Sequence, residues 1–313
     1  MRSAELPRHP AVAVDCRESN PAGPAIVMPI LNGPYRPNRA LDHGTRLAEC
    51  PAPDNLVWQD DHLLFTSGNT VFLLDGLHDG GEAEEILRFE CAVTAMAAAD
   101  DGSLAIGLAD GSIAIVGGDH DRRTIAAIGG APGSIPTTLC FADPHLLFVC
   151  LMPPRERMRP AGSLWRIDLR GTEPICLAAG LVGPSGLLLR NFDTLIVSES
   201  GCRRLLECSA TAPRVPRLLL DDLPGEPARM ARGARDSVWL ATPTLSSGSS
   251  QPMPYGLVVH LSADLAPQGS LHGDRGGRSR GVTSCLEARG ELIVACRTDD
   301  ALILVDLGHP SER

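Results

Sequence analysis

Short apolar runs separated by polar turns fill the chain from about residue 54 to residue 306. The runs are rich in Leu, Val, Ile and Ala, and Asp, Gly or Asn residues stand between them. No helical period connects the runs. Short apolar runs bounded by turn residues are typical of β-strands. The pattern therefore predicts an all-β protein.

The runs recur as a unit of three strands, about every 40 residues. In the first copy the strands are Asp54–Trp58, Leu63–Ser67 and Val71–Asp75. The six copies begin at Asp54, Val93, Thr137, Pro184, Pro227 and Val282. One blade cannot bury both of its faces alone, but blades packed in a ring cover one another. The pattern predicts a six-bladed β-propeller; a β-sandwich is the alternative, although it needs no sixfold repeat.

The repeats predict one domain with short extensions. We expect a single propeller over residues 25–308, a flexible N-terminal segment over 1–24 and a C-terminal tail over 309–313. The apolar segment Ala25–Ile30 precedes the first copy. We expect it to add the outer strand that closes the ring against the sixth blade.

Two long, turn-rich insertions interrupt the repeat. Met152–Pro160 lies within the third copy and Pro243–Pro254 within the fifth. Long loops either cover a propeller pocket and select its substrate or are surface excursions. The sequence leaves both interpretations open.

Composition excludes several classes of function. The chain has 313 residues, and all 28 basic residues are arginine, which excludes a P-loop lysine or a Schiff-base lysine. The net charge is −10 without a basic block, so we expect no nucleic-acid partner. No apolar stretch is long enough for a secretory signal or a membrane span, so we expect a cytoplasmic protein without a membrane partner. A closed ring needs no partner, which predicts a monomer or a weak homo-oligomer.

The cysteines lack CxxC spacing and mostly lie in apolar runs, where they are expected to be small buried hydrophobes.

Several segments resemble the superfamily of strictosidine synthase, SMP-30/gluconolactonase and paraoxonase. The segments that carry the resemblance are Asn32–Asn38, Ala52–Trp58, Gly162–Asp168, Val197–Ser200 and Leu223–Arg229, the last leading to Trp239–Ala241. The resemblance covers about Leu31 to Leu307. It implies a six-bladed propeller whose active site lies at the top of the central channel, where the innermost strands begin.

The resemblance also implies a metal site in the lactonase-type members, built from a first-blade carboxylate and later Asn or Asp residues. The matching positions here are Asp54 with Asn55, Thr137 or Thr138, Ser185, and Ala228-Arg229. One carboxylate remains, and an arginine stands at a ligand position, where its charge would repel a metal ion. We therefore expect no cofactor. If calcium or another divalent ion does bind, Asp54 and Asn55 are the expected ligands.

Asp54 and Arg229 are the candidate catalytic residues. An inward-pointing Arg229 would either pair with Asp54 across the channel or clamp a carboxylate or phosphate of a ligand. A register shift of one residue would instead point Arg229 outward. Asp54 is the candidate base or electrostatic anchor. We expect a small-molecule ligand, and Arg229 favours an anionic one.

Polar residues near the other strand starts are candidate substrate-binding residues. They are Asn55, Thr137, Thr138, Ser185, Thr283, Ser284 and His272. Hydroxyl groups are common at strand starts, so a structural role is the alternative for Thr283 and Ser284. His272 lies in a Gly/Arg-rich segment and is either a proton shuttle over the pocket or an exposed loop residue. Glu199 is expected to be a structural partner of Arg203 or Arg204.

Three functions remain open on the sequence. The first is a lactone or ester hydrolase with a degraded metal site, favoured because such enzymes are frequent in the superfamily. The second is a metal-independent condensing or cyclising enzyme. Strictosidine synthase-like members use a last-blade glutamate, and here Arg280–Ser284 has no carboxylate until Glu287. The third is a ligand-binding propeller without catalysis.

Overall fold

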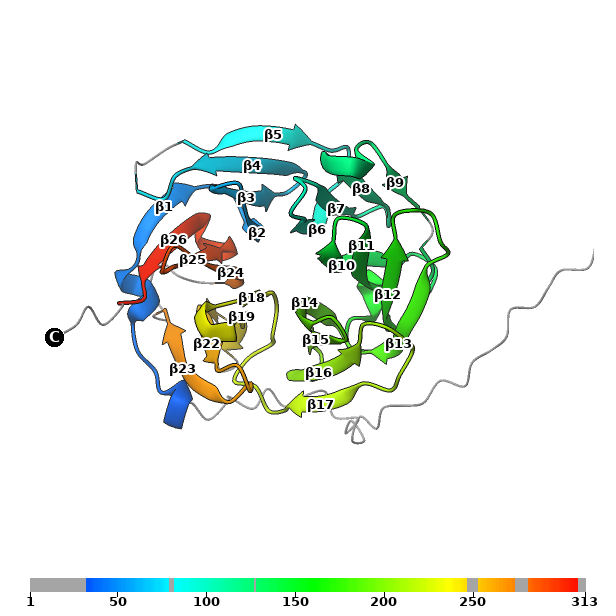
Figure 1. Cartoon of the computed structure of the whole chain (residues 1–313). Helices are drawn as coiled ribbons and strands as arrows, with labels where there is room; N and C mark the ends of the chain where they lie inside the picture. The colour runs from blue at the N-terminus through cyan, green and yellow to red at the C-terminus, as the bar shows by residue number, and fades with distance from the viewer. Residues whose placement is uncertain (1–31, 79–81, 127, 247–252, 274–280, 309–313) are drawn as a thin grey trace, which may run out of the picture.

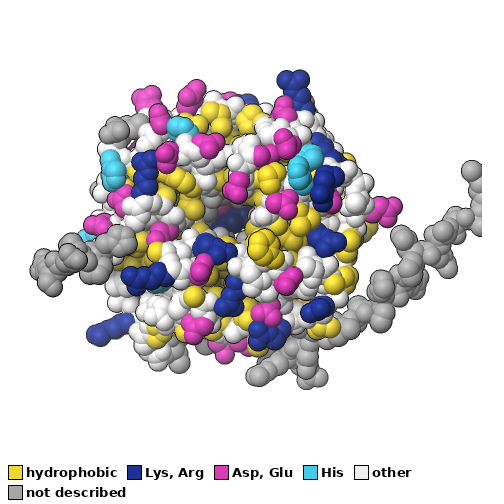
Figure 2. Space-filling view, in the orientation of Figure 1, with side chains coloured by type: hydrophobic (Ala, Val, Ile, Leu, Met, Phe, Trp, Pro, Cys, Tyr) yellow, Lys and Arg dark blue, Asp and Glu magenta, His cyan; other side chains and the backbone are white. Residues whose placement is uncertain are grey.

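Six four-stranded antiparallel sheets are arranged in a ring (Figure 1), and the space-filling view shows a hollow at its middle, the mouth of the central channel (Figure 2). The computed structural model describes residues 32–78, 82–126, 128–246, 253–273 and 281–308. Each sheet is one blade, and in five of the six blades the strand nearest the channel comes first in the sequence of the blade; in the sixth, the outermost strand does. The predicted six-bladed β-propeller is confirmed.

The strands of the first three blades follow one another along the chain. The first blade contains β2 (Pro53–Gln59), β3 (His62–Ser67), β4 (Thr70–Asp75) and β5 (Glu84–Arg88). The second contains β6 (Val93–Ala98), β7 (Leu104–Leu108), β8 (Ile113–Val116) and β9 (Thr124–Ile125). The third contains β10 (Ile135–Asp143), β11 (Leu146–Met152), β12 (Gly162–Asp168) and β13 (Ile175–Leu181).

The last three blades repeat this order with two differences: a hairpin is inserted in the fifth blade, and the outermost strand of the sixth comes from the start of the described chain. The fourth contains β14 (Pro184–Asn191), β15 (Thr194–Glu199), β16 (Arg204–Ser209) and β17 (Arg217–Leu220). The fifth contains β18 (Met230–Arg232), β19 (Val238–Ala241), β22 (Leu257–Leu261) and β23 (Pro267–His272), with a hairpin of β20 (Thr244–Ser246) and β21 (Met253–Tyr255) inserted. The sixth contains β24 (Val282–Ala288), β25 (Glu291–Cys296), β26 (Ala301–Asp306) and β1 (Thr45–Glu49).

Strand β1 closes the ring. It pairs antiparallel with β26, placing Thr45 opposite Leu304 and Glu49 opposite Ala301. The prediction that Ala25–Ile30 supplies this strand is wrong, because β1 already occupies the edge of β26. Ala25–Ile30, like the predicted flexible segment 1–24 and the tail 309–313, lies outside the described residues.

The segment before β1 crosses the outside of the fifth blade. The side-chain amide of Asn38 donates to the Ser270 carbonyl at 2.7 Å, and its oxygen accepts from the His272 backbone N–H at 3.0 Å. Leu41, 1% exposed, packs between the fifth and sixth blades against residues that include Trp239 and Val282. This clasp, residues 32–44, covers the outer edge of β23 before the chain reaches β1.

The core lies between blades. One cluster joins Phe148 and Leu164 of the third blade to Leu195 and Val197 of the fourth. Aliphatic side chains dominate, as the low aromatic content implies. Cys150, fully buried, is an example of the small buried hydrophobe that the sequence predicts. In the described part of the chain, no helix has the length and apolar character needed to cross a membrane.

Candidate functional site at the channel entrance

The six innermost strands all begin at the same end of the channel. A polar or charged residue stands at each of these starts: Asp54, Thr94, Thr137, Ser185, Arg229 and Thr283. Arg229 directly precedes β18, and the other five lie at the second or third residue of their strands. One ring of residues from six blades therefore surrounds the channel entrance.

Local irregularities in strand register shape this ring. In β6, Val93 pairs with Leu108 and Ala95 with Gly107, which leaves Thr94 as an extra residue. The same shift leaves Thr137 and Ser185 unpaired in β10 and β14. Such β-bulges free the extra residue from the ladder and re-aim its polar groups. The bulges thus release main-chain carbonyl groups toward the channel.

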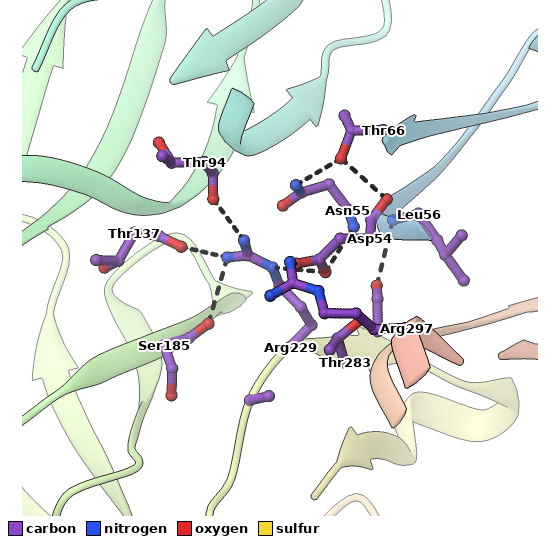
Figure 3. Close-up of polar contacts among 12 residues, drawn as sticks. Asp54, Asn55, Leu56, Thr66, Thr94, Thr137, Ser185, Arg229, Thr283 and Arg297 are labelled. Carbon is purple, nitrogen blue, oxygen red and sulfur yellow. Dashed lines mark hydrogen bonds and ion pairs between the residues drawn. The ribbon is translucent and has the colours of Figure 1, made fainter. Parts of the chain in front are cut away.

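The guanidinium of Arg229 lies among these carbonyl groups (Figure 3). One terminal nitrogen donates to the Thr137 carbonyl and, at 3.3 Å, to the Ser185 carbonyl. The other donates to the Thr94 carbonyl at 2.7 Å, and Nε lies 3.7 Å from Oδ1 of Asp54. The side chain therefore points into the channel and contacts four other blades.

A second arginine completes the charged cluster. Arg297 follows β25, whose last residue, Cys296, pairs with Val282 at the start of β24. Its guanidinium contacts Oδ2 of Asp54 at 2.8 Å. The side chains of Asp54 and Arg229 are 14% and 16% exposed, whereas that of Arg297 is 54% exposed. Arg297 is thus the more exposed of the two cations.

The cluster carries a net charge of about +1, because two guanidinium groups flank one carboxylate. Figure 2 shows basic side-chain atoms inside the hollow at the middle of the ring. Burial lowers the pKa of Arg229 most, the Asp54 carboxylate opposes that shift, and the Arg297 charge adds to it. Arginine nevertheless stays protonated in proteins. The entrance is a positive site in a chain whose net charge is −10.

Asn55 shapes the first-blade side of the site. Its backbone is left-handed, with φ of +50°, within the bulge between Asp54 and Val57. Its backbone N–H donates to Asp54 Oδ1 at 2.8 Å, and its buried amide donates to Thr66 Oγ1 at 2.8 Å. Among the described residues, Asn55 Oδ1 and Thr94 Oγ1 are buried without a hydrogen-bond partner. Both groups have hydrogen-bonding capacity to spare beside the cluster.

Several predicted substrate-binding hydroxyl groups instead connect neighbouring blades. Ser185 Oγ donates to the Pro227 carbonyl at 2.6 Å, and Thr283 Oγ1 to the Pro53 carbonyl at 3.2 Å. Ser284 Oγ accepts from the Leu56 backbone N–H at 3.2 Å. Thr137 Oγ1 donates within its own blade, to the Cys150 carbonyl at 3.3 Å. The hydroxyl groups of Ser185, Thr283 and Ser284 therefore connect blades, and the carbonyl groups of Thr137 and Ser185 face Arg229.

Two predicted site residues lie elsewhere. Thr138 is buried within the third blade, opposite Cys150. His272 is 2% exposed at the end of β23, the outer strand of its blade, and its ring contacts Ser270 Oγ at 2.7 Å. His272 itself lies in a strand that the clasp covers, so it is neither an exposed loop residue nor positioned over the channel, and residues 274–280 lie outside the described part.

Two glutamates have structural partners. Glu199 is fully buried; its carboxylate contacts Arg204 at 2.5 Å and accepts from the Val182 backbone N–H at 2.6 Å. Glu287 lies near the far end of β24 and accepts from Trp239 Nε1 at 2.5 Å. No described carboxylate of β24 therefore takes the position of a last-blade catalytic glutamate.

Sequence reasoning missed Thr94 and Arg297. Thr94 stands at a strand start like Thr137 and Ser185, so its position was a usable signal. Arg297 follows a second strand of a repeat and enters the site only through the loop that connects β25 to β26. No residue pattern marked that loop.

Both insertions leave the ring at the same end as the site, because each follows the second strand of its blade. The third-blade insertion turns toward the fourth blade, where Arg157 Nε donates to Ser200 Oγ at 3.3 Å. The fifth-blade insertion forms the β20–β21 hairpin, and residues 247–252 lie outside the described part.

The centre of this site does not fit a divalent ion. The point at which the carbonyl groups and the carboxylate converge already holds a guanidinium, and a second cation lies beside it. Calcium takes six to eight oxygen ligands, whereas four oxygens meet here. Within the described residues, no group of three His, Cys, Asp or Glu side chains is placed to hold a metal.

Comparison with solved structures shows the same fold in several proteins. Regucalcin of Agrobacterium tumefaciens, described as a calcium-binding protein, aligns with a TM-score of 0.62 at 12% identity, covering 84% of this chain and 92% of that one. A gluconolactonase of Xanthomonas campestris has a TM-score of 0.62 at 17% identity, covering 84% and 89%. A luciferin-regenerating enzyme has a TM-score of 0.60 at 16% identity, covering 86% and 95%.

These similarities confirm the six-bladed propeller fold that the resemblance implies. No family model and no curated protein matches the sequence. At such low identity the shared fold does not determine the reaction. The cluster at the channel entrance is the feature of this chain that bears on function.

Proposed function

We propose that this protein is a metal-independent hydrolase of lactones or esters that acts at the channel entrance. The observation that supports the proposal is the cluster of Asp54 with Arg229 and Arg297, which has a carboxylate and a reachable cation in one site. The gluconolactonase fold supports the substrate class. The net positive charge supports a reaction that develops negative charge.

Lactone hydrolysis has this property. Water attacks the carbonyl carbon, and charge develops on the carbonyl oxygen, where a guanidinium stabilises it. Asp54 accepts the proton of the attacking water. The ring C–O bond then breaks, and the leaving alkoxide takes that proton to become a hydroxyl. The product is a hydroxy acid, which releases its proton to the solvent, and the resulting carboxylate matches the positive site, whereas the substrate is neutral at the reacting group.

Arg297 and Arg229 have different roles in this proposal. Four contacts to other blades occupy Arg229. Among the described residues the Arg297 guanidinium contacts Asp54, and the side chain is half exposed, so its remaining N–H groups can bind the substrate carbonyl. Arg229 is then a positioning residue that holds Asp54, and Arg297 is the catalytic cation.

The test is an assay with a panel of lactones and aryl esters, in buffer containing a metal chelator. We expect turnover to persist with the chelator. Asp54→Asn should lower kcat/KM by about 100-fold or more, because a general base contributes 10²–10⁴-fold. Arg297→Gln should lower kcat/KM by a similar factor. Glu207→Gln, in an ion pair with Arg217 away from the channel, is the control and should leave the rate unchanged.

A binding role without catalysis is the second candidate. It is favoured by the occupation of Asp54, which already faces the backbone of Asn55 and both arginines. In that case small carboxylates should raise the melting temperature of the protein while no ester or lactone is turned over. Arg297→Gln should abolish that shift. Full activity of Asp54→Asn would contradict the hydrolase proposal.

A further inference from the structure

The oxygens around Arg229 form a cage for a cation. Three are main-chain carbonyl oxygens that bulges release, from Thr94, Thr137 and Ser185, and the fourth belongs to the Asp54 carboxylate. They come from the second, third, fourth and first blades. Partly charged oxygens that face one point repel one another, so the ring needs a cation there.

The cage is built around a flat donor. Two carbonyl oxygens share one terminal nitrogen of Arg229, a third accepts from the other terminal nitrogen, and the carboxylate faces Nε (Figure 3). These are directions of a planar guanidinium fork. A spherical ion would find four oxygens in place of the six to eight that calcium takes.

The cation is tethered at one place. The backbone of Arg229 is fixed to β19, because its carbonyl accepts from the Ala241 N–H at 3.0 Å and the Ala228 N–H donates to the Ala241 carbonyl at 2.7 Å. The oxygens of the cage come from the other blades and do not depend on this tether.

We propose that the four oxygens are an autonomous binding site for a guanidinium-type cation, and that Arg229 fills it in place of a bound ion. A chain without the Arg229 side chain keeps the cage and binds free guanidinium from solution. The inference does not rest on the proposed hydrolysis, because it concerns binding and stability alone.

The experiment is a chemical rescue of Arg229→Ala. We expect the variant to melt about 5–10 °C below the parent protein, since a buried ion pair and its hydrogen bonds are lost. Guanidinium chloride up to about 50 mM, far below denaturing concentrations, should raise its melting temperature by about 3 °C along a saturating curve. Calcium chloride should have a smaller effect, and sodium chloride corrects for ionic strength.

Two controls separate the cage from a general salt effect. The parent protein should show no saturable rise, because its cage is full. The double variant Asp54→Asn with Arg229→Ala should lose the rise, because the cage lacks its anion. A rise of equal size in the parent protein, or no rise in Arg229→Ala, would overturn the proposal.

A second pair of variants applies if Arg229→Ala does not fold. Arg229→Lys keeps a cation at the cage, and Arg229→Met has similar bulk without charge. We expect the lysine variant to melt several degrees above the methionine variant, because only lysine brings a positive charge to the partly buried oxygens of the cage. A methionine variant as stable as the parent protein would show that the oxygens need no cation.

Discussion

At the scale of single residues, Asp54 is the one described carboxylate that contacts both arginines of the cluster. It balances Arg229, which is largely buried, and also holds Arg297, which is half exposed. A carboxylate between two guanidinium groups is stabilised by both. Its removal leaves two like charges facing each other at the channel entrance.

We expect Asp54→Asn to lower the free energy of unfolding by about 3 kcal/mol, because one partner of a largely buried pair is left unpaired. Thermal melts against the parent protein measure the effect. Glu207→Gln removes one carboxylate from a more exposed pair and should shift the melt far less. Equal shifts for the two variants would contradict the importance assigned to Asp54.

The buried thiols predict a response to high pH. Burial raises the pKa of Cys208 and of Cys285 to about 12 from an ordinary value of 9.0. The folded state therefore keeps these protons when the unfolded state has lost them. Below about pH 9 the free energy of unfolding is unaffected by these thiols. As pH rises from 9 toward 12, it falls by about 1.4 kcal/mol per pH unit for each thiol.

Denaturant titrations between pH 8 and pH 11 test this slope. Cys208→Ala and Cys285→Ala should each remove one thiol's part of this pH dependence, whatever the substitution does to the free energy of unfolding at pH 8. A thiol reagent at pH 8 should label both residues only after unfolding, because thiolates react and buried thiols stay protonated. Labelling of both in the folded protein would contradict the prediction.

At this scale the sequence singled out Asp54 and Arg229, which the structure places side by side, but it could not assign the contacts of the threonines and serines. Hydroxyl residues at strand starts suggested side chains that face a ligand. Every residue has a carbonyl group, so the sequence offers no sign of which carbonyl leaves the ladder. Only the paired register reveals that Thr94, Thr137 and Ser185 are extra residues.

Strands with a buried face were predictable, and the outer strands were not. β3 and β7 are largely buried apolar runs, whereas β5 is mostly exposed and has charged residues at three of its five positions. β17 is apolar at Leu218–Leu220 but is only four residues long. The closing strand β1 is equally polar, so the apolar segment Ala25–Ile30 was the wrong choice.

The clasp over the fifth blade is the element whose contribution is easiest to measure. Leu41→Ala removes a side chain that is 1% exposed, and it should lower the free energy of unfolding by about 2–5 kcal/mol. Leu218→Ala is the matched control, because Leu218 is 49% exposed. Denaturant unfolding of both variants measures the difference. Equal costs would show that the clasp adds no stability.

At the scale of the whole molecule the ring is closed by pairing the two ends of its described chain. β26 has β25 on one side and β1 on the other. An open edge at β26 would expose unpaired backbone groups that favour association between chains. Closure by β1 therefore bears on both stability and solubility.

Two truncations test ring closure. Deletion of residues 1–31 keeps every described strand and should leave the melting temperature within about 2 °C of the full chain. Deletion of residues 1–50 also removes the clasp and β1, and should lower the melting temperature strongly and cause aggregation on heating. Light scattering during the melt measures both. A stable, monomeric product of the longer deletion would contradict this account of closure.

The bulges at the channel entrance have a consequence for how the protein can change over time. Three acceptors of the central cation are main-chain atoms, so replacing the side chain of Thr94, Thr137 or Ser185 leaves the acceptor in place. A single inserted or deleted residue in β6, β10 or β14 would remove it. The site therefore tolerates substitutions but not changes in strand length. As the protein changes, the spacing of these residues should be kept more strictly than their identity.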